Sequence, residues 1–140
     1  MKTIRKMALT LLSSMLLLII ATSTHAQRVN KLIELFENDE PGFGVLSFDY
    51  SLNNARSLAT SGLDFVFIDM EHAPFDVERL REFLLGMTNK RQILEKGSLQ
   101  PDVVPFVRIP AAGGAEELIA QAKQVLDVGV FGIFFPAVHT

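Results

Sequence analysis

Residues 64–74 read Asp64-Phe65-Val66-Phe67-Ile68-Asp69-Met70-Glu71-His72-Ala73-Pro74. The residues between the two aspartates are all apolar, so an extended strand here carries apolar side chains on both of its faces. Such a strand is covered on both sides, as strands of parallel sheets are. The stretch therefore predicts a buried parallel strand over 64–69, with three ionisable side chains, Asp69, Glu71 and His72, at the point where it ends.

Three more apolar runs predict strands on either side of this one, at 44–48, 103–107 and 132–135. The run at 103–107 contains Pro105, which a sheet tolerates only where no neighbouring strand needs a hydrogen bond from its missing N–H. Segments with helical periodicity lie between these strands. The chain is therefore predicted to be an α/β protein in which parallel strands alternate with helices.

Capping residues and breakers place the helices. A first short helix carries Val29, Leu32, Ile33 and Phe36 on one face and ends near the breaker at 38–42. Asn53 or Asn54 is expected to cap the second helix, which stops at Gly62, and Asp76 to cap the third, over 77–87. Residues 90–102 are expected to form a polar loop. The last helix follows Gly113 and Gly114, ends at Gly129, and is expected to bury the face that holds Leu118, Ile119, Ala122, Val125 and Leu126.

A series of four strand–helix units is compatible with an open, doubly wound sheet or with part of a closed barrel. A closed eight-stranded barrel takes about 250 residues, more than this chain has. Four strands cannot close, and the last would leave an unpaired apolar edge. We interpret residues 27–140 as the N-terminal half of a (β/α)8 TIM barrel in a truncated sequence; a complete open sheet of four strands is the alternative.

The first 26 residues have the pattern of a signal peptide. Lys2, Arg5 and Lys6 precede the apolar stretch 7–21, and the small residues around Ala26 suit a signal peptidase. We expect cleavage after Ala26 and export to the periplasm or medium, with no stable membrane span afterwards. An uncleaved leader that anchors the chain in a membrane is the alternative, although the apolar stretch is shorter than the ~20 residues of a spanning helix.

Composition excludes several classes of protein. The chain has no Cys, which rules out disulfides, thiolate metal sites and cysteine nucleophiles. The leader holds three of the 13 Lys and Arg residues and none of the 16 Asp and Glu residues, so the remaining chain has a surplus of six acidic groups. Because nucleic-acid affinity rests on neutralising phosphates, an acidic chain of this kind is not expected to bind nucleic acid.

The candidate site lies where two strands end. In barrel enzymes the chemistry gathers at the carboxyl ends of the strands. Asp69 can fix the tautomer of His72 and raise its basicity, and Arg108, after the third strand, offers a fork for a carboxylate or oxyanion. The alternatives are ordinary surface roles: a solvated acid beside a helix-capping His72, and a rim salt bridge at Arg108.

Other polar or flexible positions give weaker indications of a functional site. Gly113 and Gly114 can present N–H groups to an anion or simply form a flexible entry to the next helix. His139 follows the fourth strand and either lines the same mouth or belongs to an ordinary loop. His25 belongs to the leader and has no expected role after cleavage.

Three motifs in order resemble the HpcH/HpaI aldolase/citrate lyase family, and the resemblance covers essentially 44–138. The motifs are residues 65–74, quoted above, residues 104–110, which read Val104-Pro105-Phe106-Val107-Arg108-Ile109-Pro110, and residues 126–136, which run from Leu126 to Pro136. The resemblance implies a modified TIM barrel, homo-oligomeric at full length. It also implies metal-dependent retro-aldol cleavage of 4-hydroxy-2-oxo acids to pyruvate and an aldehyde.

The resemblance also implies roles for individual residues. His72 matches the acid/base residue, Asp69 its partner, and Arg108 the residue that holds the pyruvyl oxygens; Glu71 sits beside the site as a further substrate contact. The family's divalent cation, Mg²⁺, Mn²⁺ or Co²⁺, is held by a Glu and an Asp on later strands. Both ligands are expected beyond Thr140, so no metal ligand is expected in this chain. We therefore expect isolated residues 27–140 to be inactive.

Several features leave alternatives open. A leader is unusual in this family, and the segments 90–102 and 111–117 look longer than in a typical aldolase, so the aldehyde partner stays open. An exported homologue can bind oxo-acids without turnover. The related CoA-ester lyases usually have an acidic pair where Glu71 and His72 stand, which favours the aldolase branch. A remnant without a stable fold is the remaining alternative.

Overall fold

The computed structural model describes residues 28–111 and 113–138, so the predicted signal peptide, Met1–Ala26, and the last two residues, His139 and Thr140, lie outside the described residues. The elements follow in the order α2 (Lys31–Glu37), β1 (Gly44–Ser47), α3 (Leu52–Ala59), β2 (Phe65–Asp69), α4 (Val77–Met87), α5 (Lys90–Lys96), β3 (Val104–Arg108), α6 (Ala115–Asp127) and β4 (Gly132–Phe134). Within the described ranges, none of these helices has the length and apolar character needed to cross a membrane.

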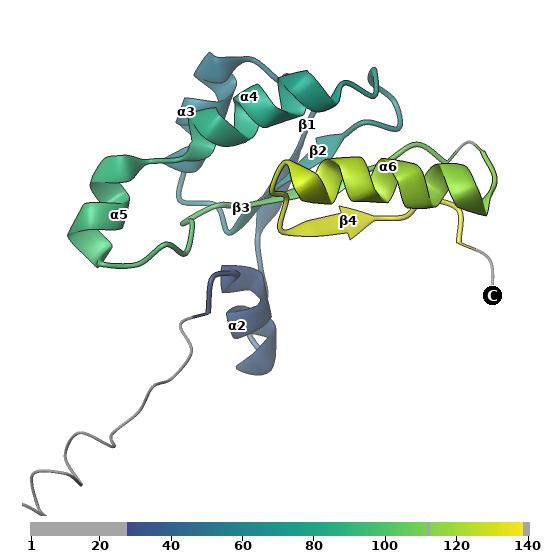
Figure 1. Ribbon diagram of the computed structural model, residues 1–140. Helices are drawn as coiled ribbons and strands as arrows, with labels where there is room; N and C mark the ends of the chain where they lie inside the picture. The colour runs from purple at the N-terminus through teal and green to yellow at the C-terminus, as the bar shows by residue number, and fades with distance from the viewer. Residues whose placement is uncertain (1–27, 112, 139–140) are drawn as a thin grey trace, which may run out of the picture.

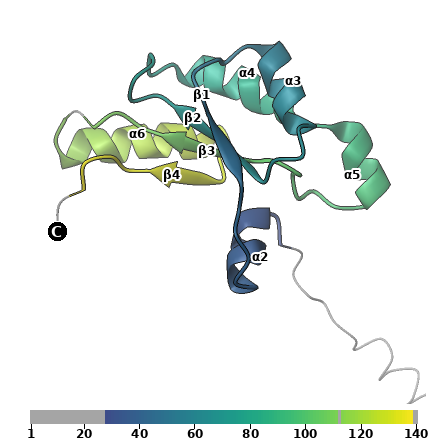
Figure 2. The ribbon, with the colours of Figure 1, turned by 180° about the vertical axis from the view of Figure 1, so that it is seen from behind.

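The four strands form one parallel sheet whose spatial order, β1-β2-β3-β4, follows the chain. Helices α3, α4 and α6 lie along one face of the sheet, and α2 lies at the end where the strands begin (Figures 1 and 2). A doubly wound sheet reverses its strand order and carries helices on both faces. The arrangement seen here is that of a segment of a (β/α) barrel, which confirms the predicted fold class.

The core fills the layer between the sheet and the helices. Val66 and Ile68 of β2 and Val107 of β3 are fully buried there. They belong to one cluster with the helical residues Ala55, Ala59, Leu80, Phe83, Met87 and Val125. Gly86 lets α4 approach α3, because a Cβ at this position would lie 2.9 Å from the Cβ of Ala55. The helices are therefore held on the sheet by apolar packing, which contributes about 25 cal/mol per Å² buried.

The opposite face of the sheet is aromatic. Phe65 meets Phe106 edge to face at 6.2 Å, and Phe67 meets Phe134 in the same way at 4.9 Å. Successive side chains of a strand point to opposite faces. Asp69 therefore lies on the same face as Phe67, and Arg108 on the same face as Phe106, so both charged groups stand at the carboxyl end of the aromatic face.

Pro105 sits in the interior of the sheet without breaking it. Its carbonyl accepts a hydrogen bond from the N–H of Phe131 at 3.0 Å, and the β3–β4 ladder proper starts one residue later, at Phe106 and Gly132. The missing N–H of Pro105 thus falls just before the point where β4 begins to pair. This confirms the expectation that the proline is tolerated where no neighbour needs its N–H.

Three local predictions differ from the structure. Residues 90–102, predicted as a polar loop, contain α5, which begins at the cap Asn89 and ends at Gly97 in a left-handed conformation, φ 62°. The cap of α3 is Ser51, whose side chain accepts from the N–H of Asn54, and not Asn53 or Asn54. In α6 the buried residues are Gln121 and Val125, whereas Ile119 and Leu126, predicted for the buried face, are exposed. By contrast, Asp76 caps α4 as predicted.

Candidate active site

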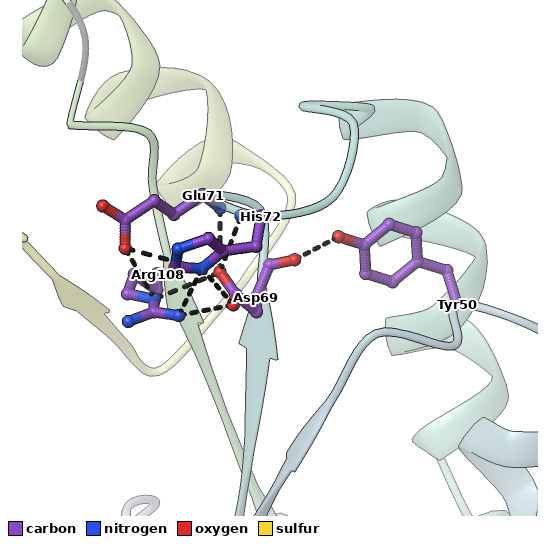
Figure 3. A network of polar contacts seen from close by, with 5 residues as sticks. All are labelled: Tyr50, Asp69, Glu71, His72 and Arg108. Atoms are coloured by element: carbon purple, nitrogen blue, oxygen red, sulfur yellow. Dashed lines mark hydrogen bonds and ion pairs between the residues drawn. The ribbon is translucent and has the colours of Figure 1, made fainter.

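The ends of β2 and β3 bring the predicted site residues together. Asp69 is the last residue of β2 and Arg108 the last of β3, and the sheet register pairs them directly. The N–H of Met70 still donates to the carbonyl of Arg108 at 2.9 Å, so the two strands stay together just beyond the pair. The chain then turns, and Glu71 and His72 come back over Asp69 (Figure 3).

The Asp69 carboxylate lies at the centre of the cluster and is fully buried. Its Oδ1 accepts hydrogen bonds from the backbone N–H groups of Glu71 and His72 at 2.9 and 3.2 Å, and from Arg108 Nε at 3.1 Å. Its Oδ2 is bonded by Arg108 Nη2 and lies 2.9 Å from His72 Nδ1. A buried carboxylate is stable only when paired in this way, so Asp69 organises both the turn and the two side chains above it.

The electrostatics follow from these contacts. Burial raises the pKa of Asp69, but the hydrogen bonds from Arg108, His72 and the two backbone N–H groups outweigh burial and hold that pKa well below its usual range. The hydrogen bond to Asp69 likewise raises the pKa of Arg108 above its ordinary value, against a smaller opposing effect of burial. The pair is therefore ionised throughout the neutral pH range.

His72 is the accessible member of the cluster, with a side chain 63% exposed. Its Nδ1 lies between Asp69 Oδ2 at 2.9 Å and Arg108 Nη2 at 2.8 Å. A protonated Nδ1 donates to Asp69, whereas an unprotonated Nδ1 accepts from Arg108. In the first tautomer Nε2 carries the free lone pair, and Nε2 makes no hydrogen bond to any described residue. This geometry suits a general base whose tautomer is set by a carboxylate.

Arg108 is held on two sides. Besides Asp69, its Nε lies 3.1 Å from Glu71 Oε2, and its guanidinium stands over the ring of Phe67, 6.0 Å from the centroid. The side chain is 22% exposed, and Nη1 has no hydrogen-bond partner among residues 28–111 and 113–138. A guanidinium fixed in this manner can present its remaining N–H groups to a carboxylate or an enolate oxygen.

The four predicted site residues, Asp69, Glu71, His72 and Arg108, thus form one cluster, in which Arg108 makes the salt bridges that the alternative expected together with the contact to His72 that a shared site requires. Gly114 is the residue before α6 and makes no side-chain cap. Tyr50, which sequence reasoning did not name, also belongs here, since its hydroxyl donates to the carbonyl of Asp69 at 2.6 Å. No motif singles out Tyr50, because its partner is a backbone atom.

The cluster also raises the question of a metal ion. The resemblance implies metal ligands beyond Thr140 and none in this chain, yet Asp69, Glu71 and His72 each offer one donor atom to a common point, and these atoms lie within 4.8 Å of one another. They do not fit a divalent cation as they stand, because Arg108 already bonds to both carboxylates. A metal ion would have to displace a guanidinium and leave it unpaired beside a second positive charge. In the described residues Arg108, and not a metal ion, therefore neutralises these carboxylates.

No family model matches the chain. The chain is 36% identical over 80 residues to the 4-hydroxy-4-methyl-2-oxoglutarate aldolase of Hapsidospora irregularis, an alignment that covers 57% of this chain and 24% of the relative. It is 31% identical over 101 residues to a hydroxypyruvate/pyruvate aldolase of Delftia acidovorans, covering 72% of this chain and 32% of the relative.

Among solved structures, the chain is similar to an HpcH/HpaI aldolase/citrate lyase family protein from Burkholderia cenocepacia. The TM-score is 0.61 at 29% sequence identity, and the match covers 79% of this chain and 38% of that one. The chain thus spans between about a quarter and two fifths of the length of these proteins.

Proposed function

The chain belongs to the HpcH/HpaI aldolase/citrate lyase family, and from this premise we propose that it contributes to a carbon–carbon lyase that cleaves a 4-hydroxy-2-oxo acid to pyruvate and an aldehyde. The observation that supports the proposal best is the contact of His72 and Arg108 through Asp69, at the carboxyl ends of neighbouring strands. A base and an anion receptor in one cluster are two of the groups that a retro-aldol reaction uses.

The described side chains account for proton transfer and binding. Arg108 receives the carboxylate and the 2-oxo group of the substrate through the N–H groups that its partners leave free. His72 Nε2 removes the proton of the 4-hydroxyl, the C3–C4 bond breaks, and its electron pair passes to the enolate of pyruvate while the aldehyde forms. C3 of the enolate then takes up a proton, and the balance closes when the protonated His72 gives back, directly or through solvent, the proton it removed. Arg108 stabilises the negative charge that develops on the enolate oxygen.

The resemblance to the family implies a divalent cation, Mg²⁺, Mn²⁺ or Co²⁺, which as a Lewis acid stabilises an enolate. Since Asp69, Glu71 and His72 do not fit such an ion, we propose that residues other than this cluster hold it. We therefore expect pyruvate release to depend on an added divalent cation.

The test is complementation. The chain is joined to the remaining strands of the Delftia acidovorans aldolase, supplied with Mg²⁺, Mn²⁺ or Co²⁺, and pyruvate is followed with lactate dehydrogenase. We expect release that His72→Asn and Arg108→Lys each reduce by at least about a hundredfold, the usual size of a general acid–base effect. A folded chimaera whose activity survives both substitutions would refute the proposal.

A second candidate function is binding of an oxo-acid without turnover. It is favoured by the same geometry, because Arg108 can hold an anion with no metal present. Calorimetry with pyruvate and oxalate discriminates the two: binding that Arg108→Lys abolishes, in a chimaera that releases no pyruvate with any of the three metals, supports the binding protein.

We also propose, from the leader pattern alone, that the protein is exported and that Met1–Ala26 is removed. Mass spectrometry of the secreted or periplasmic protein should show an N-terminus at Gln27. A protein that retains Met1 in the membrane fraction would indicate the anchored alternative instead.

A further inference from the structure

Tyr50 lies beside the cluster and forms a hydrogen bond to its backbone at Asp69. Its hydroxyl donates to the carbonyl of Asp69 at 2.6 Å, and its ring lies on the side of β2 away from Arg108 (Figure 3). The β1–β2 ladder ends at the pair Ser47 and Ile68, so β1 offers no residue opposite Asp69. A buried carbonyl without a donor is costly, and Tyr50 provides the donor that the sheet does not.

The turn that carries Tyr50 is itself fixed by side chains. Asp49 Oδ1 accepts the N–H of Ser51 at 2.8 Å. Asn54 Nδ2 donates to the carbonyl of Asp49 at 2.7 Å and to Ser47 Oγ at 3.0 Å. The ring of Tyr50 packs against the core between sheet and helices. The phenol is therefore anchored by the β1–α3 turn and the core, and not by the loop after β2.

The phenol remains a donor over the working pH range. Burial, followed by the charges of Asp69 and Asp76, raises the pKa of Tyr50 to about 12. A protonated phenol donates one hydrogen bond, and its partner here is the carbonyl of the residue whose carboxylate orients both His72 and Arg108.

We propose that Tyr50 is a positioning residue that fixes the backbone of Asp69 and, through its carboxylate, sets the places of His72 and Arg108. The inference rests on the proposed function for its role in oxo-acid binding, but not for its effect on the cluster. Among the described residues, the hydrogen bond of Tyr50 to the cluster is the one to that carbonyl, so we expect its effect to pass through Asp69.

The experiment compares the full chain with Tyr50→Phe, which keeps the ring and removes only the hydroxyl. Hydrogen exchange of the Arg108 Nε–H is followed by NMR, with Arg108→Lys to assign the signal. The amides of Val66 and Ile68 in the core of β2 report global opening. Thr88→Val is the matched control, because Thr88 also donates a hydroxyl to a backbone carbonyl, that of Leu84, at 3.1 Å and away from the site.

We expect Tyr50→Phe to accelerate exchange at Arg108 by about fivefold relative to the two core amides, the effect of one typical hydrogen bond, and Thr88→Val to leave that ratio unchanged. A Tyr50→Phe protein in which Arg108 and the core amides accelerate together, or not at all, would overturn the proposal, because Tyr50 would then support the fold in general. Pyruvate release by the chimaera is measured in parallel. A folded chimaera that releases no pyruvate with any of the three metals argues against the proposed function, while the exchange ratio still decides the role of Tyr50.

Discussion

Arg108→Leu removes the counter-ion of a buried carboxylate and is the most direct test of the cluster. In the wild-type protein Asp69 is fully buried and Arg108 is 22% exposed. Breaking a buried ion pair from one side typically costs about 3–5 kcal/mol. Asp69 keeps the N–H groups of Glu71 and His72 and the imidazole, so we expect the lower end, about 3 kcal/mol of unfolding free energy at pH 7.

The pH dependence of this loss has a definite sign. The folded-state pKa of Asp69 is lowered below its ordinary 3.8. A lowered pKa contributes stability that is present above the unfolded value and is lost as the pH falls through the folded one. The difference in unfolding free energy between wild type and Arg108→Leu should therefore be largest near pH 6–7. It should become smaller below about pH 4, where protonation begins to neutralise the unpaired Asp69 of the variant.

The assay is urea unfolding followed by far-UV circular dichroism at several pH values. The control is the double variant Asp69→Asn, Arg108→Leu, which should recover much of the lost stability because no buried charge remains. The reasoning fails if Arg108→Leu is as stable as wild type at pH 7, or if the gap is the same at pH 3.5 and pH 7.

Three further predictions concern Tyr50, the α3 cap and a glycine of β4. Tyr50 is the single tyrosine, so absorbance at 295 nm should show one phenol with a pKa near 12. Because this pKa is raised, it contributes stability that is lost as the pH rises from about 10 to 12. Asp69→Asn removes a nearby negative charge and should lower the midpoint of the phenol titration. Ser51→Ala should cost about 1 kcal/mol in thermal unfolding, whereas Asn53→Ala, which removes no cap, should cost little. Gly132→Ala should cost roughly 1–3 kcal/mol, because its Cβ would lie 2.2 Å from a phenylalanine ring of β3; an unchanged melting temperature would show that the sheet yields freely.

The sequence predicted the sheet and the cluster because both follow from short-range patterns. A strand that is apolar on both faces has to be parallel and covered, and parallel strands bring their carboxyl ends to one edge. Asp69 and Arg108, each at the end of such a strand, were bound to be neighbours once the strands were adjacent. The pairing of Asp69 with His72 was expected from their closeness in the sequence, and the turn that achieves it, in which Asp69 accepts the following N–H groups, was seen only in the structure.

The remaining features depend on contacts that a sequence does not display. Helix α5 buries none of its residues, so it lacks the apolar stripe by which helices are predicted, and its signals are only the caps Asn89 and Gly97. In α6 the polar residue Gln121 is buried, whereas hydrophobicity alone predicts that Ile119 and Leu126 are buried. Tyr50 was missed for a similar reason: its partner is a backbone carbonyl, and every residue has one, so the sequence does not mark this one.

The charges of the cluster determine how an oxo-acid anion can enter it. Asp69 and Glu71 are negative, Arg108 is positive, and with neutral His72 the sum is one negative charge. Glu71 Oε2 already lies 3.1 Å from Arg108 Nε. A substrate carboxylate that approaches Arg108 therefore competes with Glu71 for the same guanidinium. Binding without an added cation should accordingly be weak.

Glu71→Gln removes that competing charge and keeps the shape of the side chain. We expect the Kd for oxalate, measured by calorimetry on the full chain without metal, to fall by about fivefold, since about 1 kcal/mol is what one partly exposed charge contributes after screening. The gain should shrink between 50 and 200 mM salt, whereas a contact made by Glu71 itself would respond little to salt. If Glu71→Gln weakens oxalate binding instead, Glu71 is a direct substrate contact, as the family resemblance implied, and its charge does not compete with the ligand for Arg108.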